Sequence, residues 1–262
     1  MKLLKAASLL FFAIILATGC KDDDSGPSAT VNLNFLATYD GNPLVFQQTY
    51  DYPDGHKLLI QKLDFYISNV ALIDANGNKT ELVDVDFLDF TENTSLAEAE
   101  TPLTITATKI PAGSYTNLQI GIGVPANLNN EDANKLPVGN PLRDTYNAQF
   151  WSDWGSFIFL KSEGIYDNDN DGTIENNGED HPFGHHCGTN ESYVLLNFNK
   201  PIEVVANETL DLNFSVDWLQ LYNHDSGMHD FSDPTKLYTH NPNDLTLAKQ
   251  IMANFVKALS LN

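Results

Sequence analysis

The chain has 262 residues, of which 14 are Lys or Arg and 35 are Asp or Glu, so its formal net charge is -21 at pH 7. Binding to nucleic acid through phosphate contacts, or to anionic lipid through a basic patch, requires clustered positive charge, and this balance argues against both. Hydrophobic residues make up 42% of the chain, which is the composition of a folded globular protein.

The first thirty residues predict export and a lipid anchor. Two lysines precede a short apolar stretch, residues 9–16, and small residues then lead to Cys20, as at the cleavage site of bacterial lipoproteins. We expect a signal peptide over residues 1–19, a lipidated Cys20 and an acidic tether over residues 20–30; an ordinary secretory signal is the alternative. The tether resembles the export signal of surface lipoproteins. The predicted location is therefore the outer membrane, facing the outside of the cell, with membrane contact through the lipid alone.

Residues 31–262 predict a single domain made of strands. Apolar runs bounded by turn residues predict about nine strands. They cover residues 31–37, 58–73, 80–88, 103–108, 115–124, 157–161, 193–198, 202–205 and 210–216. Helical spacing of apolar residues predicts a short helix at 129–135 and an amphipathic C-terminal helix at 245–259. The expected fold is all-β, an antiparallel β-sandwich or partly open barrel with long loops and a C-terminal helix.

An acidic loop beginning at Asp167 has the pattern of a calcium-binding loop. Oxygen-bearing side chains alternate along residues 167–171, and Gly172 follows where such a loop turns sharply. The twelfth position is Gly178 instead of the usual Glu, and a carboxylate follows it. The candidate calcium ligands are Asp167, Asp169, Asp171, Thr173 and Glu179. A bound Ca²⁺ would be structural, and a solvated acidic loop is the alternative.

Six of the seven histidines lie between residues 181 and 240. His185, His186 and Cys187 are consecutive, and imidazole and thiolate are ligands that favour copper or zinc. Neighbouring side chains of a strand point to opposite faces, so we expect only one of the two histidines in a given site. Each histidine taken alone is better explained as a surface or hydrogen-bonded residue, and it is their clustering that favours a metal site. Cys187 has no second cysteine to pair with if Cys20 is lipidated.

Several segments, in this order along the chain, resemble the MbnP-like family of copper-binding proteins, which are associated with methanobactin. The segments are LDFYISNVAL at 63–72, IPAGSY at 110–115, IGIGV at 120–124, FWSDWGSFIFLKSEG at 150–164 and FGHHCG at 183–188. The resemblance implies a β-rich exported protein that binds copper through histidines, beside a tryptophan that some members oxidise to kynurenine. The acidic loop is an insertion relative to the family pattern.

The resemblance also selects candidate site residues. It places His186 at the family histidine, and the candidate tryptophans are Trp151 and Trp154. The full set of candidate copper ligands is His186, His240, His185 and His56.

The expected function is that of a cell-envelope lipoprotein that binds copper for acquisition or buffering. An outer-membrane transporter or a copper-chelating molecule would be its partner. A calcium-stabilised surface module that recognises glycan or protein is the alternative, and it would keep its ligand after every histidine is changed. The sequence has no serine elbow, phosphate loop or zincin motif, so we do not expect an enzyme; a copper-dependent oxidase is the enzymatic alternative.

Overall fold

In the computed structural model, which describes residues 26–175 and 178–262, an eight-stranded sheet is built around one long strand, β4. Four strands pair with β4 directly, and three more extend the sheet. The eight strands are β3 (Gln48–Asp51), β4 (Lys57–Ile73), β5 (Lys79–Asp89), β8 (Asn117–Ile122), β9 (Phe150–Trp151), β10 (Ser156–Tyr166), β11 (His181–Gly188) and β12 (Val194–Phe198). The order β11-β10-β4-β8-β12 puts β11 at one edge.

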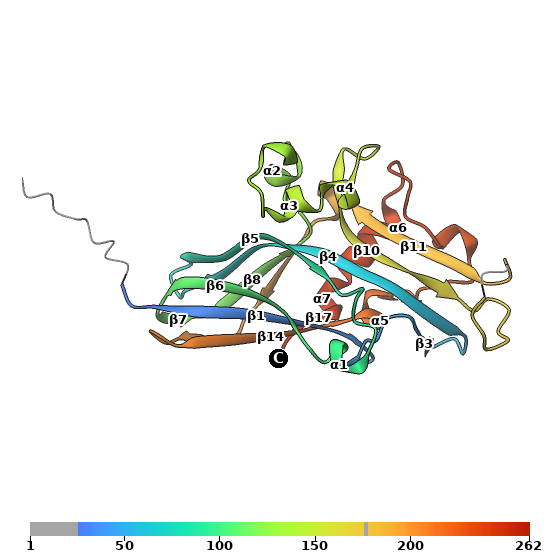
Figure 1. The fold of residues 1–262 in the computed structure, drawn as a ribbon, viewed down its shortest axis with the longest axis horizontal. Coiled ribbons are helices and arrows are strands. Elements are labelled where there is room, and N and C mark those ends of the chain that lie inside the picture. Colours follow the sequence, from blue (N-terminus) through green and yellow to red (C-terminus); the bar gives the residue numbers. More distant parts are fainter. Residues whose placement is uncertain (1–25, 176–177) are drawn as a thin grey trace, which may run out of the picture.

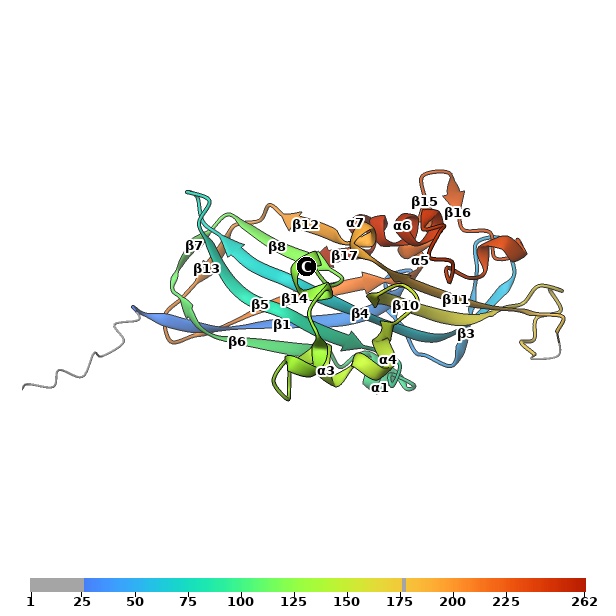
Figure 2. The same ribbon diagram turned by 90° about the horizontal axis from the view of Figure 1, so that it is seen from above.

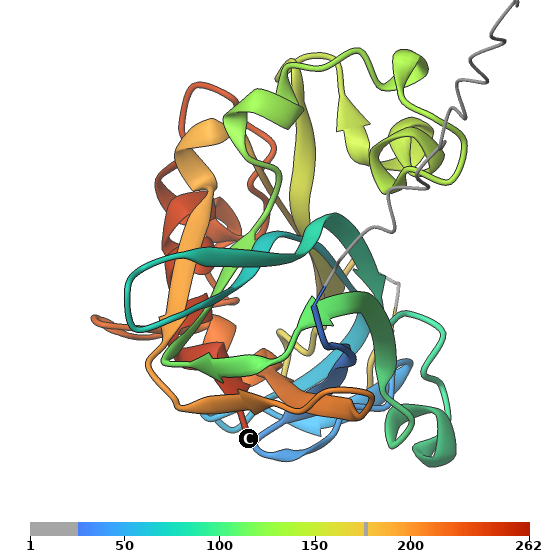
Figure 3. The same ribbon diagram turned by 90° about the vertical axis from the view of Figure 1, so that its left-hand side faces the viewer.

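A second sheet of five strands faces the first (Figure 1). Its strands are β1 (Ser28–Tyr39), β2 (Asn42–Pro43), β6 (Leu103–Pro111), β14 (Thr209–Asp217) and β17 (Leu259–Leu261). β1 pairs with β14 in parallel, whereas the other named pairs among the described residues are antiparallel. Seen end-on, the two sheets curve around a common interior (Figure 3). The expected all-β architecture is confirmed, with this one parallel pair inside it.

The alternating pattern of β1 explains how the second sheet covers the first. Val31, Leu33 and Phe35 are fully buried, and the residues between them are partly exposed. In the parallel register Phe35 lies opposite Phe214, and their rings stack with centres 4.6 Å apart. Both strands therefore bury the same face, and burial of such side chains contributes about 1.5–3 kcal/mol each.

Short elements complete the fold. Two small sheets pair β7 (Gly113–Tyr115) with β13 (Ile202–Val204) and β15 (Asn223–His224) with β16 (Gly227–Met228). The α-helices are α1 (Leu96–Ala99), α2 (Ala126–Asn129), α3 (Pro141–Asp144), α4 (Tyr146–Gln149), α5 (Trp218–Leu221), α6 (Thr246–Ala253) and α7 (Phe255–Ala258). The 3₁₀ turns are η1 (Ala133–Lys135), η2 (Asn190–Ser192) and η3 (Pro234–Lys236). From above, α5, α6 and α7 gather at one edge of the molecule and α1, α3 and α4 at the other (Figure 2).

The two predicted helices differ in detail from the observed ones. The expected C-terminal helix over 245–259 is interrupted at Asn254, whose amide bonds to the Leu221 carbonyl and to His224, and the chain then enters β17. The expected helix at 129–135 is two separate turns, α2 and η1.

The predicted N-terminal features lie largely outside the described residues. These are the signal peptide, Cys20 and the first part of the tether, residues 20–25. Among the described residues, no helix has the length and apolar character needed to cross a membrane.

Candidate metal centre

The pairing of β10 with β11 places His186 on the face that carries Lys161. Lys161 lies opposite His186, and Glu163 lies opposite Gly184, two residues along. The His186 ring nitrogen Nε2 is 2.8 Å from the Glu163 carboxylate oxygen Oε1. This hydrogen bond is the main cause that lowers the pKa of Glu163, so the carboxylate stays charged. Nε2 therefore carries a proton, and Nδ1 of His186 remains able to bind a cation.

His240 reaches His186 because the segment before it runs along β11. Tyr238 forms a parallel bridge with Gly184, and the Thr239 hydroxyl donates to the His186 carbonyl at 2.7 Å. These contacts place the rings of His186 and His240 4.6 Å apart, centre to centre. Burial, followed by the charge of His186, lowers the pKa of His240, which favours a neutral ring at pH 7. Among the described residues, no hydrogen bond uses a ring nitrogen of His240.

Trp151 lies across both histidines. Its ring centre is 5.1 Å from that of His240 and 6.0 Å from that of His186, with edge-to-face geometry in both cases. Trp154 stacks on Trp151 at 4.7 Å. Trp154 also packs directly over Gly188, where a side chain would collide with its ring. Of the two predicted tryptophans, Trp151 is the one in contact with both histidines.

The spacing of the two imidazoles suits a shared ion. Metal–imidazole bonds are about 2.0 Å long and a ring nitrogen lies about 1 Å from the ring centre, so two rings sharing an ion have centres at most about 6 Å apart. His186 and His240 meet this condition at 4.6 Å. Imidazole nitrogens are good ligands for copper and zinc and poor ones for hard cations. The donor set therefore fits the metal that the family resemblance implies.

The structure places His185 and His56 elsewhere. His185 points to the opposite face of β11, where both of its ring nitrogens are engaged, with the Tyr222 hydroxyl and the Lys236 carbonyl, each at 2.8 Å. Burial lowers the pKa of His185 to about 3. His56 bonds through Nδ1 to the Asp167 carbonyl at 2.6 Å and stacks on Tyr166. Neither ring joins His186 and His240.

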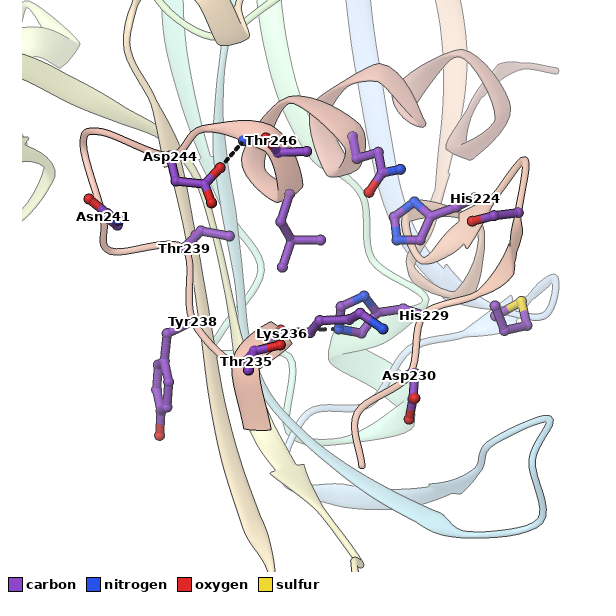
Figure 4. A pocket seen from close by; sticks show the side chains of 14 residues that line it. His224, His229, Asp230, Thr235, Lys236, Tyr238, Thr239, Asn241, Asp244 and Thr246 are labelled. Atoms are coloured by element: carbon purple, nitrogen blue, oxygen red, sulfur yellow. Dashed lines mark hydrogen bonds between the residues drawn. The ribbon is translucent and has the colours of Figure 1, made fainter. Parts of the chain in front are cut away.

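A cavity of about 490 Å³ lies beside this centre but is not lined by its residues. Figure 4 shows His224 and His229 on one side of the cavity and Tyr238 on the opposite side. The rings of His224 and His229 are 5.6 Å apart, which would also allow a shared ion. However, the amide nitrogen of Asn254 donates to the Leu221 carbonyl and lies 2.9 Å from Nδ1 of His224. That contact puts the ring proton on Nε2, the nitrogen that would have to bind the ion.

The acidic loop brings together only part of its predicted ligand set. One carboxylate oxygen each from Asp167, Asp169 and Asp180 lie within 4.8 Å of one another. Asp171 instead accepts hydrogen bonds from the backbone and hydroxyl of Thr173. Asp180, which is not among the ligands predicted from the sequence, is the third carboxylate of the cluster.

Two residues of these sites were missed by the sequence reasoning. Strand periodicity places Glu163 on the same face as Lys161, but its contact with His186 depends on the pairing of β10 with β11, which no local pattern signals. Asp180 follows Glu179 directly, and no local pattern distinguishes the two carboxylates.

Comparisons with known proteins agree with this description. A family model described as MbnP matches residues 28–240. Among solved structures, MbnP from Methylosinus trichosporium matches with a TM-score of 0.50 and 14% sequence identity, over 74% of this chain and 77% of that one. At this identity the likeness is one of fold. No curated protein matches the sequence.

Proposed function

Since the chain belongs to the MbnP family, we propose that it binds copper through His186 and His240, beside Trp151, and serves the cell envelope in acquiring or buffering this metal. The observation that carries the proposal is the 4.6 Å approach of the two imidazole rings, brought together from segments more than fifty residues apart in the chain.

The surroundings of the two rings support copper binding. Copper needs the neutral imidazole, and the lowered pKa of His240 keeps that form at physiological pH. Glu163 accepts the Nε2 proton of His186 and so orients the ring, as carboxylates commonly do behind metal-bound histidines. Trp151 contacts both rings edge to face. It is also the tryptophan best placed for the oxidation to kynurenine that the family resemblance implies.

The proposed location is the outer membrane, with the lipid on Cys20 as the anchor. β1 begins at one end of the long axis of the molecule, and the β10–β11 connection lies at the opposite end (Figure 1). A tether that enters at β1 would thus leave the β10–β11 hairpin pointing away from the lipid. A transporter or a soluble copper chelator could then reach His186 and His240 from the aqueous side.

Copper analysis of site variants tests the proposal. The purified protein is loaded with Cu(I) or Cu(II), freed of loose metal and analysed for copper. We expect about one copper per chain, as two converging imidazoles imply, and at least a tenfold loss of affinity in His186→Ala and in His240→Ala.

His56→Ala is the matched control, because His56 lies outside the centre and should leave copper binding unchanged. Full copper binding by both His186→Ala and His240→Ala, with circular dichroism showing an intact fold, would disprove the proposed site.

A further inference from the structure

Three carboxylates converge where β10 leads into β11. Asp167 follows the last residue of β10, and Asp180 precedes the first residue of β11. Asp169 lies in the loop between them, and one oxygen from each of the three lies within 4.8 Å of the others. No ion pair between described residues includes any of the three. Three negative charges this close repel one another strongly unless a cation or protons intervene.

Asp167 supplies an independent sign of a ligand. Its side chain is 0% exposed, which is rare for an unpaired carboxylate. The oxygen Oδ2 accepts from the Gly172 amide at 3.1 Å, but Oδ1 is buried without a hydrogen-bond partner. Burying a carboxylate oxygen without a partner costs several kcal/mol of desolvation free energy, and no protein group near Oδ1 compensates for this cost by a hydrogen bond. Oδ1 belongs to the carboxylate that faces Asp169 and Asp180, so a cation held there would supply the missing partner.

From these observations we propose that Asp167, Asp169 and Asp180 bind one Ca²⁺ ion, which joins the ends of β10 and β11. Oxygen donors select hard cations, and a partly exposed loop can complete the six to eight oxygens of Ca²⁺ with backbone carbonyls and water. Mg²⁺ demands a stricter octahedron and gives up its water reluctantly, so it fits this irregular loop less well.

The proposed ligand set differs from the one that the sequence motif predicts. Asp180 is held in place by two amides, since it accepts from the backbone of Asn168 at 3.0 Å and of Glu175 at 2.7 Å. Asp171 is turned towards Thr173, whose amide and hydroxyl it accepts at 2.8 and 2.6 Å. Asp180 therefore replaces the side chain of Asp171 as the third carboxylate ligand.

The ion would connect three strands. The Asp167 amide donates to the Lys57 carbonyl at 3.0 Å, and its own carbonyl accepts from His56 at 2.6 Å, so Asp167 also ties the loop to the start of β4. A bound Ca²⁺ would offset the mutual repulsion of the three carboxylates and so stabilise the folded hairpin.

Calorimetric titration of the EGTA-treated protein with CaCl₂ tests the site, with MgCl₂ titrated in parallel. We expect one Ca²⁺ per chain and a melting temperature raised by several degrees, with Mg²⁺ at least tenfold weaker. Asp180→Asn should weaken Ca²⁺ binding at least tenfold and abolish the thermal shift. Asp171→Asn removes the same charge from the same loop and is the matched control, expected to bind Ca²⁺ within about threefold of the parent protein.

The proposed ligand set would be overturned if Asp171→Asn weakened Ca²⁺ binding more than Asp180→Asn did. Absence of Ca²⁺ binding in the parent protein would overturn the site itself. If Asp180→Asn fails to fold, the exposed Asp169→Asn takes its place with the same expected loss. Copper binding is measured on the same variants and should be unaffected, so that failure of this site is distinguishable from failure of the histidine centre.

Discussion

Glu163 and His186, on the neighbouring strands β10 and β11, are joined by a hydrogen bond of 2.8 Å between Oε1 and Nε2. Because Glu163 is charged, the bond fixes both the tautomer and the direction of the imidazole ring. The two residues belong to one antiparallel ladder, so the protein alone holds the ring in the position that the proposed copper site requires.

Glu163→Gln should weaken copper binding about tenfold, the lower end of the range for such supporting partners. Glutamine keeps the size of the side chain but loses the charge that makes His186 a better electron donor. The measurement is a competition titration against a chelator of known affinity. Glu191→Gln, at an exposed ion pair with Lys249, is the control and should leave the affinity unchanged. Equal affinities of Glu163→Gln and the parent protein would contradict the role of Glu163.

In protein whose Trp151 is not oxidised, Trp151→Phe should remove most of the change in tryptophan fluorescence that copper produces. Copper quenches indoles at short range, and Trp151 contacts both proposed ligands. The comparison is Trp218→Phe. Trp218 is buried on β14's side of the core, where its indole nitrogen donates to Ser162 at 2.9 Å. Quenching that survives in Trp151→Phe but disappears in Trp218→Phe would place the metal elsewhere.

The metal-free protein should lose stability as the pH falls below 6.5. Burial, followed by the charge of His224, lowers the pKa of His229 in the folded protein to about 4 from its ordinary value of about 6.5. The unfolded chain therefore takes up the proton first, and the free energy of unfolding declines by up to about 1.4 kcal/mol per pH unit for this group between pH 6.5 and 4. His185 affects stability in the same direction, because burial lowers its pKa in the folded protein to about 3.

Urea unfolding of the metal-free protein at pH 7 and pH 5 measures this decline. His229→Gln should flatten the pH dependence, because it removes the group whose pKa burial lowers. Asp64 acts in the opposite direction, because burial raises its pKa to about 6 and its protonation favours the folded state. An identical slope in His229→Gln and the parent protein would show that His229 does not titrate on unfolding.

Thiol labelling should find no reactive cysteine in the folded protein. Cys187 is 0% exposed, and burial raises the pKa of its thiol to about 12, so the reactive thiolate is scarce. In protein purified from membranes and unfolded in guanidinium, one thiol should react. Two reactive thiols would mean that Cys20 carries no lipid.

Local patterns predicted most of the long strands because burial acts on individual side chains, but they missed β11 (His181–Gly188), whose polar and glycine-containing sequence has no clear apolar alternation. The alternation in β1 is typical of a strand with one buried face, and the long apolar run of β4 is typical of a strand buried on both faces. The interruption of the C-terminal helix at Asn254 was not predictable in this way. It arises from hydrogen bonds to Leu221 and His224, about thirty residues away in the chain.

The sequence predicted which types of residue form the candidate site, but it predicted less well which individual residues come together. His186 and His240 were both named from the sequence, but their contact depends on the bridge between Gly184 and Tyr238, which no local pattern signals. The placement of His185 on the opposite face follows from strand periodicity alone. The place of Asp180 in the acidic cluster depends on where the chain re-enters β11, which the sequence does not mark.

The parallel pairing of β1 with β14 bears on when the protein can fold. Thr30 lies opposite Thr209, so nearly the whole chain must be available before the second sheet can form around β1. Contacts between such distant segments slow folding, because the loop between them must close first. A chain that leaves the cytoplasm N-terminus first would thus cross the membrane before its first strand finds its partner. If the chain is exported as proposed, the pairing of β1 with β14 would delay closure of the core until most of the chain has crossed the membrane.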